Sequence, residues 1–428
     1  MSLAVYPVFR TPLNREDAIL LSAIDPRRAS EPHATLAQLF APPLDWTRLF
    51  HQADRHDVVP SLYLQLQKLP AGAVPQGIRE KFAHRAYACL AWSLHLRGVL
   101  LNLLTLLNQA DIPVMPLKGL VLAELLYNDC TIRPTNDLDL LVQEQDIEKA
   151  AQLLVAAGCR RHFSPEQEAG LYHYLFSFRS GDGAEVLIEL HRDFTSAHLA
   201  RLDVQKVWAA AVAQVWEGRV VWTMKTDDQF LYLCTHAMRD GLGSVKNLLD
   251  IVLMIELFGA TWCWDDLVKT VHDAHIQTPV WLSLWHCQQL FPVTLPSGFL
   301  DTIRPMRRLG LVIGDVLFAW RGGVLHSPLA LLRSPMGTIL AFLWEDSWRG
   351  KVRHLRRMFL PAAGLRARRT GLPVATSMVQ GYPRWLWQGC VQLADQVNVL
   401  RRVRSEQKSQ TPWRSRPADA STADNCSS

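Results

Sequence analysis

Leu117-Lys118-Gly119-Leu120 begins the stretch that decides the fold, and the stretch ends with Arg133-Pro134-Thr135-Asn136-Asp137-Leu138-Asp139-Leu140-Leu141-Val142. A short apolar segment, 112–117, leads up to the glycine. Residues 120–127 follow with a composition typical of a helix, and a polar connection then leads to Arg133. Acidic and apolar residues alternate from Asp137 before three apolar residues, and this pattern predicts a strand.

The two aspartates of this strand are expected to act together. Residues two apart on a strand share a face and lie roughly 6 to 7 Å apart along the backbone. Asp137 and Asp139 would therefore project from one face, while Leu138 and Leu140 enter the core. Two carboxylates so placed repel each other unless a divalent cation lies between them. Oxygen ligands of this kind suit Mg²⁺ or Mn²⁺, which can also hold substrate phosphates.

A third carboxylate is expected on a later strand. Residues 171–178 and 185–191 have the composition of strands, and the turn at 180–183 predicts a hairpin between them. Glu189 is the best candidate, as a metal ligand or as the acceptor of a proton. Glu185 and Asp193 are rival candidates nearby. The competing interpretation of Glu189 is an exposed strand residue without a function.

Taken together, these motifs resemble the bacterial family of uncharacterised nucleotidyltransferases, within the DNA polymerase β-like superfamily. The resemblance covers roughly residues 45 to 260. It is carried by Leu117-Lys118-Gly119, Arg133, Asp137-Leu138-Asp139-Leu140-Leu141-Val142, Ile188-Glu189-Leu190-His191, His236 and Leu248-Leu249-Asp250. It implies an α+β fold, with a small mixed sheet and helices as the core and helical regions on both sides.

The resemblance also implies roles for individual residues. Asp137, Asp139 and Glu189 would be the catalytic residues and would hold Mg²⁺ or Mn²⁺. The nucleotide-binding residues would be Lys118, Gly119, Arg133 and His236. Gly119 would open a helix whose free backbone N–H groups face phosphates, and the two cations would neutralise phosphate charge.

Each nucleotide-binding candidate also has an ordinary structural interpretation. Lys118 and Arg133 could each be a salt-bridge partner. Gly119 could serve only a tight strand-to-helix turn. His236 lies on an apolar helix, where a lone histidine is more often a hydrogen-bonded core residue.

The implied reaction is transfer of a nucleoside monophosphate from an NTP to an acceptor hydroxyl or phosphate. The acceptor stays open among a sugar or glycan precursor, a peptide, a protein side chain and an RNA end. A kinase-like phosphotransferase is the close variant. A regulatory protein that only binds a nucleotide is the alternative from another class.

Composition favours a globular protein, since 49% of the 428 residues are hydrophobic and 20% are charged. The eight cysteines form no Cys-x-x-Cys pair, so their spacing supports neither a cysteine zinc site nor a disulfide framework, and we expect a cytoplasmic protein. The first residues lack the pattern of a signal peptide. The most apolar stretch, 247–264, carries Asp250 and Glu256, which predicts a buried helix and no transmembrane segment.

Positive charge gathers near the C-terminus. From Arg349 onward 15 Lys and Arg stand against 4 Asp and Glu, a net of +11 in a chain whose total is +5. The segment 348–404 also carries tryptophans, so weak contact with an anionic membrane or with nucleic acid is one interpretation. Docking of this segment on the acidic body of the same chain is the other.

We expect five segments along the chain. They are an N-terminal helical region at 1–110, the nucleotidyltransferase core at 111–195, a C-terminal helical domain at 196–345, the basic amphipathic segment at 346–404 and a disordered tail at 405–428. Residues 86–109 predict a long helix buried beneath the sheet. Further helices are expected at 144–157, 202–215, 228–239, 244–258 and 264–275.

Overall fold

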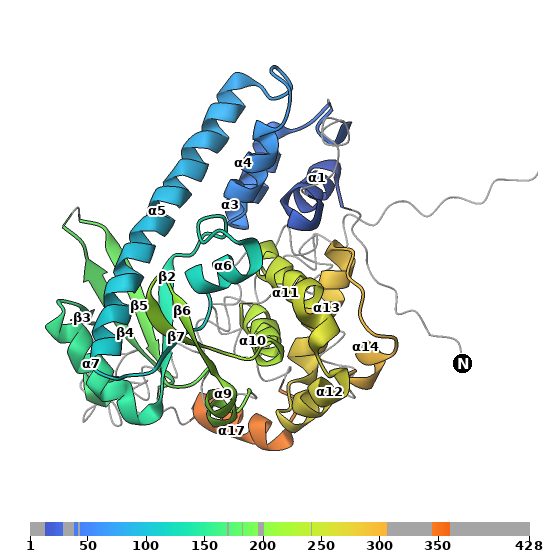
Figure 1. Ribbon diagram of the computed structural model, residues 1–428. Helices are drawn as coiled ribbons and strands as arrows, with labels where there is room; N and C mark the ends of the chain where they lie inside the picture. The colour runs from blue at the N-terminus through green and yellow to red at the C-terminus, as the bar shows by residue number, and fades with distance from the viewer. Residues whose placement is uncertain are drawn as a thin grey trace, which may run out of the picture.

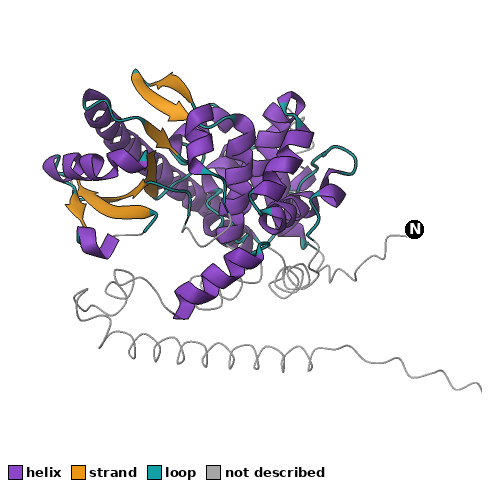
Figure 2. Ribbon diagram, turned by 90° about the horizontal axis from the view of Figure 1, so that it is seen from below, coloured by secondary structure: helices purple, strands orange, loops and turns teal. Residues whose placement is uncertain are grey.

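A five-stranded mixed sheet carries the three acidic residues that were predicted to be catalytic. The structure, a computed structural model, describes residues 13–28, 38–41, 43–168, 171–181, 183–195, 201–240, 242–305 and 345–359. The strands are β1 (Val114–Pro116), β2 (Asp137–Val142), β3 (Arg160–Arg161), β4 (His173–Arg179) and β5 (Glu185–His191), in the order β1-β2-β5-β4-β3. β2 and β5 are parallel, and the other neighbours are antiparallel. Figure 2 shows the strands gathered at one side of a mainly helical molecule.

The sheet has one apolar face and one polar face, as the alternation in β2 predicts. Leu138 and Leu140 are buried in a core that they share with α5 (Gln76–Gln109) and α7 (Ile147–Ala156). Asp137 and Asp139 alternate with these leucines and so lie on the opposite face. The expected α+β core with helices beside a small mixed sheet is therefore confirmed (Figure 1).

α5 is longer than the predicted helix, and only its second half lies beneath the sheet. It begins at Gln76 and runs for 34 residues. Its second half packs beneath the sheet through residues from Leu96 to Leu107. Its first half packs against the N-terminal helices through Phe82 and Ala86, and its opposite side, with Tyr87 and Leu94, is exposed. By length and composition alone this helix could cross a membrane, which is a weak indication because core helices of soluble proteins pass the same test. It is the single such helix among the described residues.

A second small sheet corrects the expectation of a helix at 202–215. That helix, α9, covers only Val204–Ala210, and β6 (Val212–Trp216) follows it. β6 pairs with β7 (Arg219–Thr223) across a turn in which Glu217 and Gly218 both have positive φ angles, of 50° and 73°. Two central turn residues with positive φ are typical of tight hairpins, and the valines of both strands favour extended backbone.

Helices before and after the sheet share one hydrophobic core. α1 (Arg15–Ile24), α3 (Trp46–Arg55) and α4 (Val59–Gln67) supply its N-terminal part. Its C-terminal part comes from α10 (Thr226–Arg239), α11 (Val245–Phe258), α12 (Trp264–Asp273), α13 (Gln277–Leu290) and α14 (Phe299–Thr302). The predicted helices at 228–239, 244–258 and 264–275 are thus confirmed. The remaining helical elements are α6 (Leu120–Tyr127), α8 (Pro165–Glu168) and the short turns Pro26–Arg28, Glu144–Asp146 and Gly259–Thr261.

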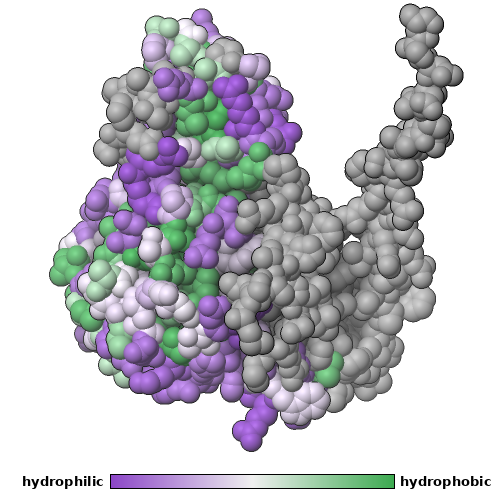
Figure 3. Space-filling model, turned by 90° about the vertical axis from the view of Figure 1, so that its right-hand side faces the viewer, coloured by the Kyte–Doolittle hydropathy of each residue, from purple (hydrophilic) through white to green (hydrophobic). Residues whose placement is uncertain are grey.

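The described part of the basic segment is one helix, α17 (Trp348–Phe359). Asp346, just before it, accepts hydrogen bonds from the backbone N–H and the hydroxyl of Thr278 on α13, at 2.7 and 2.5 Å. Trp348 and Val352 are exposed. On the side of the molecule toward α1 and α13, hydrophobic patches alternate with polar ones (Figure 3). The rest of the basic segment and the tail at 405–428 lie outside the described residues.

Candidate active site

Three carboxylates meet on the polar face of the sheet. β2 and β5 are adjacent and parallel, and their register places Asp139 beside Glu189. Asp137 precedes Asp139 by two residues and therefore shares its face. One oxygen atom from each of the three side chains lies within 4.8 Å of the others. The structure thus brings together the three residues that were predicted to be catalytic.

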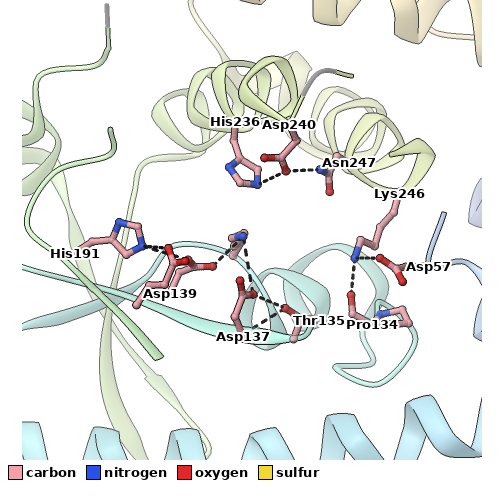
Figure 4. A network of polar contacts seen from close by, with 12 residues as sticks. Asp57, Pro134, Thr135, Asp137, Asp139, His191, His236, Asp240, Lys246 and Asn247 are labelled. Carbon is pink, nitrogen blue, oxygen red and sulfur yellow. Dashed lines mark hydrogen bonds and ion pairs between the residues drawn. The ribbon is translucent and has the colours of Figure 1, made fainter. Parts of the chain in front are cut away.

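Lys118 and His191 lie between these carboxylates. The Lys118 ammonium is 3.0 Å from Asp139 Oδ2 and 4.0 Å from Asp137 Oδ1. His191 Nε2 is 3.1 Å from Asp139 Oδ1 and 3.2 Å from Glu189 Oε2, so this nitrogen carries the proton and donates. Figure 4 shows His191 and Asp139 directed toward each other. The Lys118 ammonium and the N–H of His191 therefore offset part of the negative charge of the cluster.

The two aspartates differ in how strongly the fold favours their charge. Burial alone would raise the pKa of Asp139, but Lys118 and the hydrogen bond from His191 hold that pKa well below its usual range. Burial and repulsion by Asp139 raise the pKa of Asp137. Burial would also raise the pKa of Glu189, and the hydrogen bond from His191 outweighs it, so the pKa of Glu189 is lowered. Asp137 is thus the least stabilised of the three anions.

Gly119 forms the turn between β1 and α6 beside the carboxylates. Its φ of 71° lies in the left-handed region, which glycine adopts without the strain that a side chain would cause. The helix α6 starts directly after it, so the first backbone N–H groups of α6, which lack intrahelical partners, are at this turn. The side chain of Leu120, the residue after Gly119, is buried in the core and so does not fill the space at this turn.

The loop before Asp137 is attached to α11 by buried polar contacts. Arg133 donates to Asp250 with distances of 3.0, 2.8 and 2.7 Å, and the Tyr127 hydroxyl donates to the same carboxylate at 3.0 Å. Lys246 donates to the carbonyl oxygen of Pro134 at 2.7 Å (Figure 4). Arg133 is 4% exposed and Asp250 is fully buried. The structure therefore places Arg133 in a buried ion pair with Asp250 and not with the three carboxylates. Both residues belong to the sequence pattern that carries the family resemblance.

Helix α10 faces the carboxylates from the other side (Figure 4). His236 Nδ1 is 2.7 Å from Arg239 Nη2, and His236 Nε2 is 3.1 Å from Asp240 Oδ2. Burial lowers the pKa of His236 to about 4, so the ring is neutral at pH 7, accepts from Arg239 and donates to Asp240. Both ring nitrogens of His236, a predicted nucleotide-binding residue, thus bind neighbours on its own helix.

Arg239 is a candidate that sequence reasoning missed. Its guanidinium donates to the carbonyl oxygen of Phe194 at 3.1 Å and has no ion pair among the described residues. The side chain is exposed to solvent, and its charge interacts with Asp139. A single arginine in the last turn of a helix is too common for the sequence to single it out.

The two rivals of Glu189 lie elsewhere. Glu185 is at the opposite end of β5 and forms an ion pair with Arg160 at 3.1 Å. Asp193 follows β5 and forms an ion pair with Arg201 at 2.7 Å. Neither belongs to the groups of described side chains that could hold a metal ion together.

The donor set fits a divalent cation of the Mg²⁺ type. All three side chains offer carboxylate oxygens, which is the chemistry that Mg²⁺ and Mn²⁺ prefer. The ammonium of Lys118 occupies part of the space between the aspartates, which shows that this space attracts positive charge. Asp137 and Glu189 keep about 30% and 29% of their side-chain surface exposed, so a cation has access from solvent.

A family model described as "Uncharacterised nucleotidyltransferase" matches residues 42–292, which is more than half of the chain. The chain belongs to this family. It is therefore an enzyme of the class that transfers nucleotidyl groups, as the sequence motifs implied. No curated protein sequence matches the chain.

Two solved structures show distant similarity to this nucleotidyltransferase. The antibiotic-resistance factor ANT(2'')-Ia is 14% identical with a TM-score of 0.30, and the match covers 42% of this chain and 91% of that one. An antigenic nucleotidyltransferase-like protein from Paracoccidioides brasiliensis is 17% identical with a TM-score of 0.27, covering 46% and 94%. At these scores neither neighbour contributes to the assignment of the site.

Proposed function

We propose that this nucleotidyltransferase moves a nucleoside monophosphate from an NTP to an acceptor hydroxyl or phosphate, with Mg²⁺ or Mn²⁺ held by Asp137, Asp139 and Glu189. The observation that carries the proposal is the convergence of these three carboxylates on adjacent parallel strands. When bound, the cation would neutralise phosphate charge and activate the attacking oxygen. The acceptor could be a glycan precursor, a peptide, a protein or an RNA end.

The protein's own residues would position the triphosphate. The N-terminus of α6 at Gly119 presents backbone N–H groups, which favour phosphate oxygens. Lys118 is held at the aspartates in this structure, and a cation bound there would release its ammonium toward the phosphates. Arg239 faces the same space and needs no ion pair to be broken, so it is the described arginine best placed for a phosphate contact.

Nucleotides labelled at the α-phosphate or at the γ-phosphate test which group is transferred. The full chain is incubated with Mg²⁺ and each of the four NTPs, labelled at the α-phosphate or at the γ-phosphate. Nucleotidyl transfer releases pyrophosphate and leaves the α-label on the acceptor, or on a nucleoside monophosphate where water is the acceptor. Transfer of the γ-label instead would identify a kinase. Nucleotide binding without turnover, in lysates that contain candidate acceptors, would support the regulatory alternative.

Glu189→Gln is expected to lower turnover on the order of 10²-fold with a modest effect on NTP binding, as for a general base or a catalytic metal ligand. The lowered pKa of Glu189 keeps the carboxylate ionised at neutral pH, as a metal ligand requires. Asp193→Asn is the matched control and should change little, because Asp193 is paired with Arg201. Steady-state kinetics of both variants decide this, and the reverse pattern would move the third carboxylate to Asp193.

Arg239→Gln is expected to raise KM for the NTP about 10- to 100-fold with a smaller effect on kcat. A hydrogen bond to a charged group contributes about 1.5–3 kcal/mol, which corresponds to this range. Arg201→Gln removes another arginine near the end of β5 and serves as the control. If both variants change KM equally, the effect is general electrostatics and Arg239 has no specific phosphate contact.

A further inference from the structure

A second group of metal-type side chains lies beside the three carboxylates. His173 on β4 stands directly opposite His191 on β5 in the antiparallel register, and Glu189 is two residues before His191 on the same face. One ligand atom from each of these residues lies within 4.8 Å of the others. All three come from paired strands, so the backbone holds them in place without a loop.

The geometry of the two imidazole rings suits a common ligand. Their centroids are 5.3 Å apart and their planes are inclined by 35°. An ion that binds each ring nitrogen at about 2.0–2.1 Å with a near-tetrahedral angle holds two ring centres about 5 Å apart. The Tyr172 ring packs against both imidazoles, with centroid distances of 4.3 and 5.7 Å, and restricts their rotation.

His191 already has the hydrogen bond that metal-binding histidines usually make. Its Nε2 donates to Asp139, and its Nδ1 has no hydrogen-bond partner among the described residues, although the side chain is 1% exposed. A ligating histidine generally donates its second ring nitrogen to a carboxylate or carbonyl, which fixes the tautomer and strengthens the ligand. Metal binding through Nδ1 would keep the hydrogen bond from Nε2 to Asp139 and would give the buried Nδ1 atom a partner.

We propose that His173, His191 and Glu189 form a second cation site, selective for a borderline transition metal such as Zn²⁺ or Co²⁺. Two imidazoles and one carboxylate suit these ions, whereas Mg²⁺ prefers oxygen ligands alone. His173 and Glu189 are half-buried, which leaves a path from solvent. Because Glu189 belongs to both groups, an ion here competes with the carboxylate site for that side chain.

The test measures metal binding alone, so it does not depend on nucleotidyl transfer. The full chain is titrated with Zn²⁺ in excess Mg²⁺, by calorimetry, and with Co²⁺, by visible absorption, which reports nitrogen ligation. We expect wild-type protein to bind Zn²⁺ and to show a Co²⁺ spectrum that Zn²⁺ displaces. His173→Asn should weaken Zn²⁺ binding on the order of 10²-fold and remove the spectrum. Asp137→Asn should retain both.

Three outcomes would overturn the proposal. Absence of Zn²⁺ binding by folded wild-type protein would do so, as would undiminished binding by His173→Asn. Equal loss in Asp137→Asn would assign the ion to the three carboxylates instead. Circular dichroism of each variant, together with His173→Gln as a second substitution, separates loss of a ligand from loss of folding.

Discussion

Asp137→Asn is expected to reduce NTP turnover at least about 10³-fold while leaving the melting temperature unchanged or raised. Removing a metal ligand forfeits several kcal/mol of transition-state stabilisation, and each 1.36 kcal/mol is about tenfold in rate. The pKa of Asp137 is raised by burial and by Asp139, so at neutral pH the folded protein carries an anion that it disfavours. A neutral amide removes that cost. Kinetics and a thermal melt of the same preparation measure both effects.

Asp139→Asn is the matched variant, with the same loss of turnover and the opposite effect on stability. The folded state depresses the pKa of Asp139, so its charge stabilises the fold above the unfolded pKa, and this stabilisation is lost as pH falls. At neutral pH the amide leaves the Lys118 ammonium with only Asp137, 4.0 Å away. The melting temperature should therefore fall by several degrees. Turnover above a few per cent in either variant would place the metal site elsewhere.

The difference between the two variants does not follow from the sequence alone. From the sequence, two aspartates on one strand face predict that neutralising both leaves the fold intact and, if anything, relieves repulsion in the metal-free protein. The structure places Lys118 and His191 between the carboxylates, so repulsion is concentrated on Asp137 and attraction on Asp139. The sequence contains both side chains, but it does not show which carboxylate each one contacts.

Local patterns predicted the site-bearing sheet because period-two alternation determines which face a side chain takes. The alternation in β2 separated Asp137 from Leu138, and the hairpin turn before β5 paired β5 with β4. The parallel pairing of β5 with β2, which brings Glu189 beside Asp139, joins segments distant in sequence. The missed hairpin of β6 and β7 shows the limit of such patterns. Residues 202–215 contain apolar residues at spacings that both a helix and a strand allow, and the deciding signal is the Glu217-Gly218 turn just beyond them.

Partners distant in sequence could not be predicted in the same way. Arg133 and Asp250 are 117 residues apart, and nothing local to either one shows that they are in contact. A phosphate contact and a structural ion pair require the same residue type, so the motif alone left both roles open. The structure favours the structural role, because the pair joins the loop before Asp137 to α11.

Asp250→Ala is accordingly expected to destabilise the fold by about 3–5 kcal/mol, the usual cost of leaving one partner of a buried ion pair without the other. Arg133 is 4% exposed, and its guanidinium makes its ion pair with this carboxylate, which also accepts the Tyr127 hydroxyl. A domain of this size loses roughly 2–4 °C in melting temperature per kcal/mol. The expected decrease is therefore roughly 6–20 °C, measured by a thermal melt.

Arg133→Ala should produce a decrease of the same order, because it leaves the Asp250 carboxylate buried with the Tyr127 hydroxyl as its partner. Arg160→Ala breaks the exposed pair with Glu185 and should shift the melting temperature much less. KM for the NTP, measured well below the melting temperature, separates the two roles of Arg133. A stable Arg133→Ala protein with a strongly raised KM would show that this arginine binds the nucleotide and that the buried pair contributes little to the fold.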